Sequence, residues 1–440
     1  MPLFFLLAAP VLAVVEHLLL AALLSDAEGR LRKDELWVSE GKNNLMIAAD
    51  TVGKGLVTDY PSDVPTHALQ IPFKEGRLPE HTVLRSGFGR TNFYRMFDVY
   101  GKQNLFTFHS ASDHGERKKL LANANSKSNV IRGHVAEMVS AKIQDYLRLL
   151  KAQENAGGPN EISTSLHYYS LDSITHFLGT KEADMVRKRF LKPLLPMQKP
   201  STYTGIRAHA LRAMHKYTAA AAADKADETA KNTIIGRLYQ SNAKLSDLEI
   251  ASECADHFLA GIDTTSDTLM FLIWALSRPE NEAYGTPMVE AADRLPYLDA
   301  VIKETLRLYA PLPASELRCA DVKTVIDGYT IPAGTTVLHR YEEVFPEPLK
   351  WNPDRWLDDP KHVSMMKKWW WAFLSGGRMC IGSNLALAEM ALVPAIYRKY
   401  RTKVKSGEEN ASPGITSRFE VFGDETFAET KASPVLHGRV

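Results

Sequence analysis

The sequence predicts a mainly helical protein with small β-sheets. Six stretches after residue 110 carry apolar residues at three- and four-residue spacing, the pattern of a buried helix face: 128–152, 163–178, 205–223, 246–277, 296–309 and 383–401. Strand-like alternation is confined to short pieces such as 323–330 and 419–422. No internal repeat and no long linker rich in Gly, Ser or Pro divides the 440 residues, so we expect one large domain over residues 30–440.

The composition excludes several classes of protein. The chain has 53 basic and 52 acidic side chains and no polybasic tract, so nucleic acid is excluded as a partner. Its three cysteines, Cys254, Cys319 and Cys380, are too few and too widely spaced for a disulfide framework, and no C-x-x-C pair indicates zinc. Cysteine usage of this kind favours a reducing compartment.

The N-terminus carries a candidate membrane anchor over residues 1–25. Its first 24 residues are mostly apolar, and about 20 suffice to cross a bilayer. Basic residues follow at Arg30, Arg32 and Lys33, which places the downstream domain in the cytosol by the positive-inside rule. Because Glu16 and His17 interrupt the apolar run, a buried core helix or a wrongly chosen start of the coding frame is the alternative.

The stretch 246–277 predicts the longest helix. Ser246 and Glu249 form a capping box at its start, and Pro279 closes its end. With a rise of about 1.5 Å per residue, the helix would be roughly 45 Å long. A helix of that length crosses a whole domain.

Polar residues interrupt the apolar middle of this helix. Gly261 is followed by Asp263 and Thr264, residue types that weaken helices or prefer caps and turns. Such an exception in a core helix favours a functional site. The alternative is a solvated polar face, with the Thr264 hydroxyl bonded back to the Ala260 carbonyl.

The segment 373–382, F-L-S-G-G-R-M-C-I-G, places a single thiol between a glycine-rich loop and an apolar helix. Backbone N–H groups at that helix start would stabilise a Cys380 thiolate. Gly376 allows a tight turn, Gly382 allows close approach to a flat ligand, and Arg378 could hold a carboxylate. The alternatives are a buried structural cysteine or a catalytic thiol, although no local signature ties a histidine to Cys380.

This segment resembles the F-x-x-G-x-R-x-C-x-G signature of cytochromes P-450 at every defined position. Three further patterns agree with that family in the same order along the chain. They are A-G-I-D-T-T at 260–265, E-x-x-R at Glu304 and Arg307, and P-D-R-W at 353–356. The i, i+3 spacing of Glu304 and Arg307 puts both charges on one helix face.

The resemblance implies a family fold with haem b (iron protoporphyrin IX) as the cofactor. Cys380 would be the sulfur ligand to the iron, and Phe373 would shield that sulfur from water. Asp263 and Thr264 would relay protons to dioxygen. Gly261 would loosen the long helix beside the dioxygen.

The remaining roles implied by the resemblance concern the haem edge and the stability of the fold. Arg378 and Arg318 would pair with haem propionates, and His114 and Lys118 stand where the family usually has a Trp and a basic residue. Gly382 would let the backbone lie close to the haem. A buried charge cluster, which must be fully paired to be tolerated, would comprise Glu304, Arg307 and Arg355.

The resemblance also implies an activity. The chain would insert one oxygen atom from O2 into a small apolar organic substrate. Electrons would come from a separate NADPH-cytochrome P-450 reductase, since no G-x-G-x-x-G nucleotide site or flavin domain is present. The anchor would hold the enzyme at the endoplasmic reticulum membrane with its catalytic domain in the cytosol. The run W-W-W-A-F at 369–373 resembles fungal members that modify secondary metabolites.

Two rival hypotheses remain open. A haem-thiolate isomerase or peroxygenase would need no dioxygen activation, but such members can dispense with the acid–alcohol pair that Asp263 and Thr264 provide. A degenerate haem-binding protein without turnover is the other, and NADPH consumption with a reductase would distinguish it.

Three family segments are shortened, which favours the degenerate hypothesis. The D-E-L-W-V run arrives as early as residue 34, the stretch from Pro279 to Leu295 is brief, and most of a strand is missing after Val337.

Overall fold

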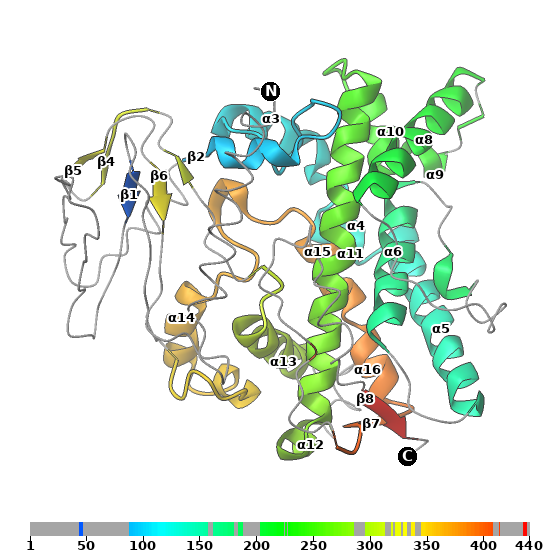
Figure 1. Cartoon of the computed structure of the whole chain (residues 1–440), viewed down its shortest axis with the longest axis vertical. Helices are drawn as coiled ribbons and strands as arrows, with labels where there is room; N and C mark the ends of the chain where they lie inside the picture. The colour runs from blue at the N-terminus through cyan, green and yellow to red at the C-terminus, as the bar shows by residue number, and fades with distance from the viewer. Residues whose placement is uncertain are drawn as a thin grey trace, which may run out of the picture.

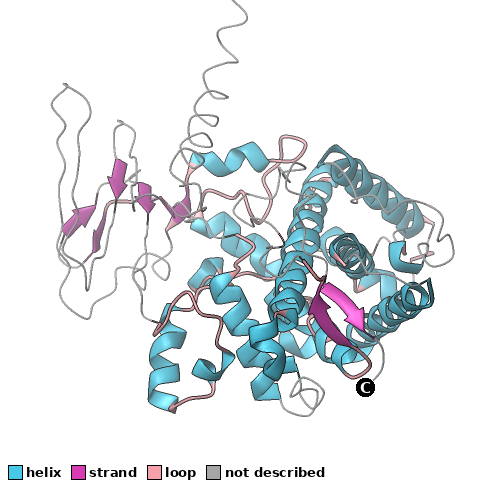
Figure 2. Cartoon of the chain, turned by 60° about the horizontal axis from the view of Figure 1, so that its bottom comes forward, coloured by secondary structure: helices cyan, strands magenta, loops and turns pink. Residues whose placement is uncertain are grey.

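The chain folds into a helical body with small sheets at its margins. A computed structural model describes residues 88–156, 162–179, 184–187, 203–223, 225–226, 228–285, 295–312 and 345–407, with shorter pieces at 44–46, 318–319, 322–326, 329–331, 336–338, 413 and 434–437. The helices gather in one body, and the strands β1 to β6 lie to one side of it (Figures 1 and 2). The predicted fold class, mainly α with small β-sheets, is therefore confirmed.

Helices account for most of the described residues. The longer ones are α3 (Ala111–Ala122), α5 (Gly133–Ala156), α6 (Ser163–Leu178), α8 (Tyr203–Ala222), α11 (Asp247–Ser277), α13 (Leu295–Leu308) and α14 (Pro360–Trp369). Shorter ones are α4 (Lys127–Val130), α9 (Glu228–Lys231), α10 (Ile234–Tyr239), α12 (Glu282–Gly285), α15 (Ser383–Glu389) and α16 (Leu392–Tyr397). Four of the predicted helical stretches match α5, α6, α8 and α13 to within a few residues.

Helix α11 is the axis of the helical body (Figure 1). It begins at the predicted capping box: Ser246 Oγ accepts the Glu249 N–H at 3.3 Å, and Glu249 Oε2 accepts the Ser246 N–H at 2.9 Å. Along its length it packs against α6 and α8, and its apolar second half, 269–276, is buried. The prediction of a long core helix is confirmed.

The predicted helix over 383–401 is wrong as a single element. It is divided into α15 and α16, with a break at Met390 and Ala391. Pro394 explains the break, because its ring nitrogen has no hydrogen for the Met390 carbonyl and its ring crowds that carbonyl. The helix that follows Cys380 therefore has seven residues, and the dipole expected behind the thiolate is shorter than predicted.

The sheets are small. One has the order β1 (Asn44–Met46), β6 (Thr336–Leu338), β3 (Arg318–Cys319) and β2 (Gly89–Arg90), with β1 parallel to β6 and the other pairs antiparallel. The hairpin of β4 (Thr324–Ile326) and β5 (Tyr329–Ile331) confirms the alternation predicted at 323–330. A third sheet pairs β7 (Arg401–Val404) with β8 (Pro434–His437). The strand predicted at 419–422 lies outside the described residues.

Strand β6 ends next to the point at which most of a family strand was expected to be missing. Its residues Thr336–Leu338 pair with β1 on one edge, and Thr336 and Val337 pair with β3 on the other. Strand β6 therefore joins β1 to β3 in this sheet, and the segment 339–344 that follows lies outside the described residues.

The candidate anchor at 1–25 lies outside the described residues, as do 34–38 and the stretch 286–294. Among the helices that the structure does describe, none has the length and apolar character needed to cross a membrane.

Candidate functional site

The loop before α15 presents the thiol of Cys380. Its backbone turns sharply at Gly376, where φ is +68°, and at Leu374, where φ is +58°. The Cys380 N–H donates to the Phe373 carbonyl at 2.9 Å, and the Cys380 side chain is exposed. A Cβ added at Gly382 would meet only Cys380 Sγ, at 4.0 Å. Space beside the sulfur is therefore open to a ligand.

Helix α3 braces this loop through Lys118. The Lys118 ammonium donates to the carbonyls of Gly377 at 2.8 Å and Met379 at 2.6 Å. Burial lowers the pKa of Lys118, and the neighbouring Cys380 opposes that shift. Lys118 thus fixes the loop that carries the thiol, a contact that the sequence did not indicate.

Arg378 is buried and also bonds to backbone. Its Nη1 donates to the Phe108 carbonyl at 2.8 Å, while its Nη2 donates to those of His109 at 3.0 Å and Ser110 at 3.2 Å. These bonds tie the Cys380 loop to the chain before α3. The Arg378 guanidinium, which the sequence predicts to pair with a haem propionate, is thus bonded to three backbone carbonyls in this structure.

Basic side chains cluster around the buried His114. Burial is the largest cause that lowers its pKa, to about 3, followed by the charges of Arg378, Lys118, Arg90 and Arg318. Each of these charges disfavours the imidazolium, and no carboxylate of the described residues is among the causes. Four cations around one neutral imidazole form a site that fits a ligand with more than one negative charge.

Arg90 is the member of this cluster that the sequence analysis missed. Its guanidinium lies over the rings of Tyr94 and Phe106, at 4.3 and 4.1 Å, and Nη1 donates to the Phe106 carbonyl at 2.8 Å. Strand pairing places it directly opposite Arg318, so two like charges share one face of the sheet. A single arginine outside any helix pattern has no sequence signal that would mark it.

Helix α11 offers an open stripe in the middle of its buried length. Ala260 is exposed, and Gly261, Asp263 and Thr264 are partly exposed, whereas Ile262 and Thr265 on the same helix are buried. The Thr264 hydroxyl donates to the Ala260 carbonyl at 2.6 Å, the local bond considered as the alternative. Helices α11 and α15 are in contact, so the stripe lies on an element that adjoins the Cys380 segment.

Gly261 has a role other than the predicted one. A Cβ at this position would lie 2.7 Å from Ile174 Cγ1 of α6, which is too close for any real pair of carbons. The helix is continuous through this point. The glycine therefore allows α6 and α11 to approach, and no loosening of α11 is seen.

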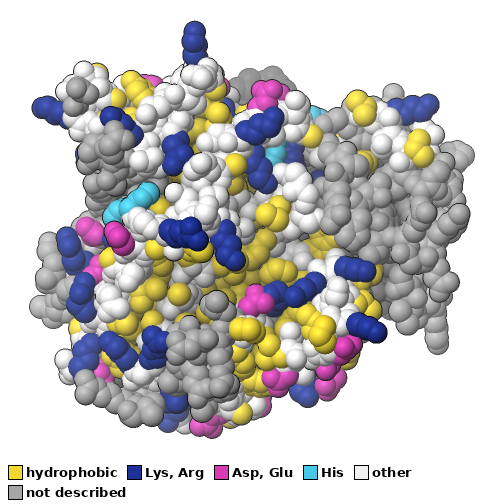
Figure 3. Space-filling model, turned by 180° about the vertical axis from the view of Figure 1, so that it is seen from behind, with side chains coloured by type: hydrophobic (Ala, Val, Ile, Leu, Met, Phe, Trp, Pro, Cys, Tyr) yellow, Lys and Arg dark blue, Asp and Glu magenta, His cyan; other side chains and the backbone are white. Residues whose placement is uncertain are grey.

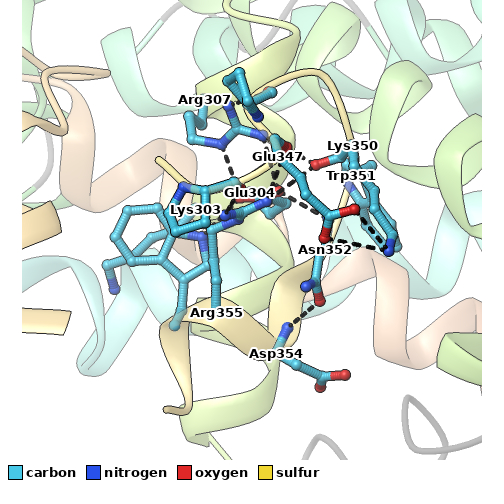
Figure 4. A network of polar contacts seen from close by, with 12 residues as sticks. Lys303, Glu304, Arg307, Glu347, Lys350, Trp351, Asn352, Asp354 and Arg355 are labelled. Carbon is cyan, nitrogen blue, oxygen red and sulfur yellow. Dashed lines mark hydrogen bonds and ion pairs between the residues drawn. The ribbon is translucent and has the colours of Figure 1, made fainter. Parts of the chain in front are cut away.

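The structure brings Glu304, Arg307 and Arg355 into one buried cluster (Figure 4). Glu304 is fully buried. Its Oε1 accepts from Arg307 Nη2 at 2.9 Å, Arg355 Nε at 3.0 Å and the Asn352 N–H at 2.8 Å. Its Oε2 accepts from Arg307 Nε and Trp356 Nε1, both at 3.0 Å. Both carboxylate oxygens therefore have several hydrogen-bond partners, as a buried charge needs.

Comparison with known proteins points to one family. The cytochrome P450 family profile matches residues 200–417. Cytochrome P450 monooxygenase azaI of Aspergillus niger is 25% identical over 74% of this chain and 83% of its own length. Cytochrome P450 monooxygenase orf2 of another A. niger strain is 32% identical over 42% of this chain and 40% of its own.

A bacterial relative is about as similar to this chain in sequence as the two fungal relatives are. Cyclooctat-9-en-7-ol 5-monooxygenase of Streptomyces melanosporofaciens is 30% identical over 53% of this chain and 56% of its own length. The matched part of the chain thus spans less than two thirds of both this relative and orf2.

Proposed function

Because this chain belongs to the cytochrome P450 family, whose members are haem-thiolate enzymes that bind haem b, we propose that it is a monooxygenase. It would insert one oxygen atom from O2 into a small apolar organic substrate. Relatives named as monooxygenases in a fungus and a bacterium support this activity. Haem b supplies the iron at which dioxygen is reduced and activated.

The proposal rests on one observation: an exposed thiol, that of Cys380, is carried by a loop that bonds to a member of a cluster of basic side chains. Cys380 is exposed beside Gly382, and the positive charges that act on His114 would attract the two carboxylates of a porphyrin. Cys380 would bind the iron, while Arg90 and Arg318 would hold the carboxylates. Lys118 and Arg378 would keep the thiol-bearing loop in place through their backbone bonds.

Thr264 and Asp263 would handle protons on the open stripe of α11. Since the Thr264 hydroxyl donates its hydrogen to the Ala260 carbonyl, its oxygen can accept a hydrogen bond from a bound group. Asp263, the adjacent residue, is partly exposed and so can exchange a proton with water.

The surface of the protein bears on its substrate and its attachment to a membrane. Hydrophobic side chains form a broad band on the face shown in Figure 3, with lysines and arginines beside it. An exposed apolar patch can mark a binding surface, which supports an apolar substrate. We propose a secondary metabolite as the substrate, an NADPH-cytochrome P-450 reductase as electron donor, and attachment to the endoplasmic reticulum membrane through residues 1–25.

The carbon-monoxide difference spectrum of the reduced protein tests the thiolate. Cys380→Ala should lose the red-shifted Soret band, because the sulfur ligand causes that shift. Cys254→Ala is the matched control: Cys254 is fully buried in α11, burial raises its pKa, and the band should persist. A band that survives Cys380→Ala would contradict the proposed ligand.

A second measurement separates an enzyme from a haem-binding protein without turnover. Purified protein with a reductase should consume NADPH in an oxygen-dependent way. A normal carbon-monoxide spectrum without NADPH consumption would favour the degenerate protein.

A further inference from the structure

A buried histidine of α6 faces the acidic residues of α11. The His167 side chain is 4% exposed, and its Nε2 lies 3.5 Å from Asp263 Oδ1 and 3.7 Å from Asp267 Oδ1. These are ion-pair distances, longer than good hydrogen bonds. In the described part of the chain, the acidic side chains within 4 Å of this ring are these two aspartates.

The two aspartates by themselves would repel. Asp263 and Asp267 stand four residues apart on α11, so their carboxylates lie on the same helix face. Only 16% and 19% of these side chains are exposed, which limits screening by water. A positive charge between them offsets the repulsion.

The position of the His167 ring suits a cation between the two carboxylates. Its Nδ1 lies 2.7 Å from the Ser163 carbonyl oxygen. A carbonyl can only accept, so Nδ1 must hold a hydrogen. Nε2 lies at ion-pair distance from two carboxylates, which attract a positive charge, so a second hydrogen on the ring suits this position. An imidazole with hydrogens on both nitrogens is the cationic form.

We propose that His167 is a positioning residue for Asp263, and that its imidazolium keeps the Asp263 carboxylate ionised and turned toward α6. The inference deepens the proposed function, since it rests on Asp263 as the proton-handling acid. Without the cation, Asp263 and Asp267 would share a proton or separate. The Asp263 carboxylate would then turn away from α6.

Nitrogen NMR of the full-length haem protein reads the charge of His167 directly. The reduced carbon-monoxide form is diamagnetic, and labelling histidine with 15N gives signals from its 14 histidines. His167→Gln identifies the signal by its loss. We expect hydrogens on both ring nitrogens at pH 7 in the native protein. We also expect a neutral ring, protonated at Nδ1, when Asp263→Asn and Asp267→Asn are combined. A neutral ring in the native protein overturns the proposal.

The ratio of hydrogen peroxide to water formed from NADPH electrons tests the effect of His167 on Asp263. With a reductase, NADPH electrons end in hydrogen peroxide or in water, and no substrate is needed. His167→Gln should raise the ratio of peroxide to water about tenfold, less than the roughly 10²–10⁴-fold that a positioned acid itself contributes. Adding Asp263→Asn to His167→Gln should raise the ratio no further than Asp263→Asn alone, because both act through one group.

Restoring the charge separates positioning from a merely structural role. His167→Lys keeps a cation at this position and should return the ratio most of the way to the native value. His176→Gln, a histidine change at the other end of α6, should leave the ratio unchanged. An unchanged ratio in His167→Gln, or an equal rise in His167→Lys, contradicts the proposal. If the native chain takes no electrons from NADPH, the proposed function fails, and the NMR result still decides the charge of His167.

Discussion

Removing the carboxylate of Glu304 should destabilise the fold more than any surface change. Glu304→Ala deletes the acceptor of five hydrogen bonds, three of which come from arginines. Each bond to a charged group contributes about 1.5–3 kcal/mol, so the three alone represent roughly 5–9 kcal/mol.

The net cost is smaller because the arginines keep other partners. Arg307 Nη1 remains on the Pro348 carbonyl and Arg355 Nη1 on that of Pro346, each at 2.6 Å. We therefore expect a loss of about 3–5 kcal/mol, the range observed when one partner of a buried ion pair is removed. Typical folding stability is about 5–15 kcal/mol, so much of the variant should be unfolded or free of haem.

Urea unfolding followed by the Soret absorbance measures this loss. Asp299→Ala is the matched control, because Asp299 lies on the same helix and pairs with Lys303 while 57% exposed. A surface ion pair contributes about 0–1 kcal/mol, so the control should unfold near the native midpoint. If Glu304→Ala yields haem-loaded protein with the midpoint of the control, the buried cluster does not support the fold as argued.

Three further predictions follow from the site. Thr264→Ala should retain haem and divert NADPH electrons to hydrogen peroxide, because a methyl group cannot accept a hydrogen bond; unchanged peroxide yield would remove Thr264 from proton handling. Gly261→Ala should cost about 1–3 kcal/mol in urea unfolding, because its Cβ would lie 2.7 Å from Ile174 Cγ1. The pKa of His114, lowered to about 3, means that the folded chain resists a proton that the unfolded chain takes up below about 6.5. The free energy of unfolding of the haem-free chain should therefore fall as pH drops from 6.5 towards 3, and it should fall less in His114→Gln. Bound haem should make the native protein and His114→Gln more alike in this respect. Equal pH dependence of the two haem-free proteins would contradict the prediction.

Local patterns were sufficient for several of the helices and for the resemblance to the family. The capping box at Ser246 located the start of α11 because the bonds of a cap join residues three apart. Apolar spacing located α6 and α13 because the period of a helix face is a local property. The segment 373–382 indicated the family because its ten residues are contiguous. Glu304 and Arg307 added to this because they lie within one helix turn.

Contacts between distant segments were decided only by the tertiary structure. Arg378 donates to carbonyls about 270 residues away, Lys118 bonds to the loop of Cys380, and Arg90 faces Arg318 across two strands. Nothing local records such partners, because packing of whole helices and strands sets them.

The same distinction applies to Gly261 and His167. Sequence patterns placed Gly261 in a helix motif, but the surface of α6 made it a packing residue. His167 is an unremarkable residue in a predicted helix, and the carboxylates that it contacts lie about 100 residues later in the chain. The sequence by itself determined which chemical groups the chain has and which elements carry them. The tertiary structure decided which of those groups meet, since charge and hydrogen bonding depend on distances that only packing sets.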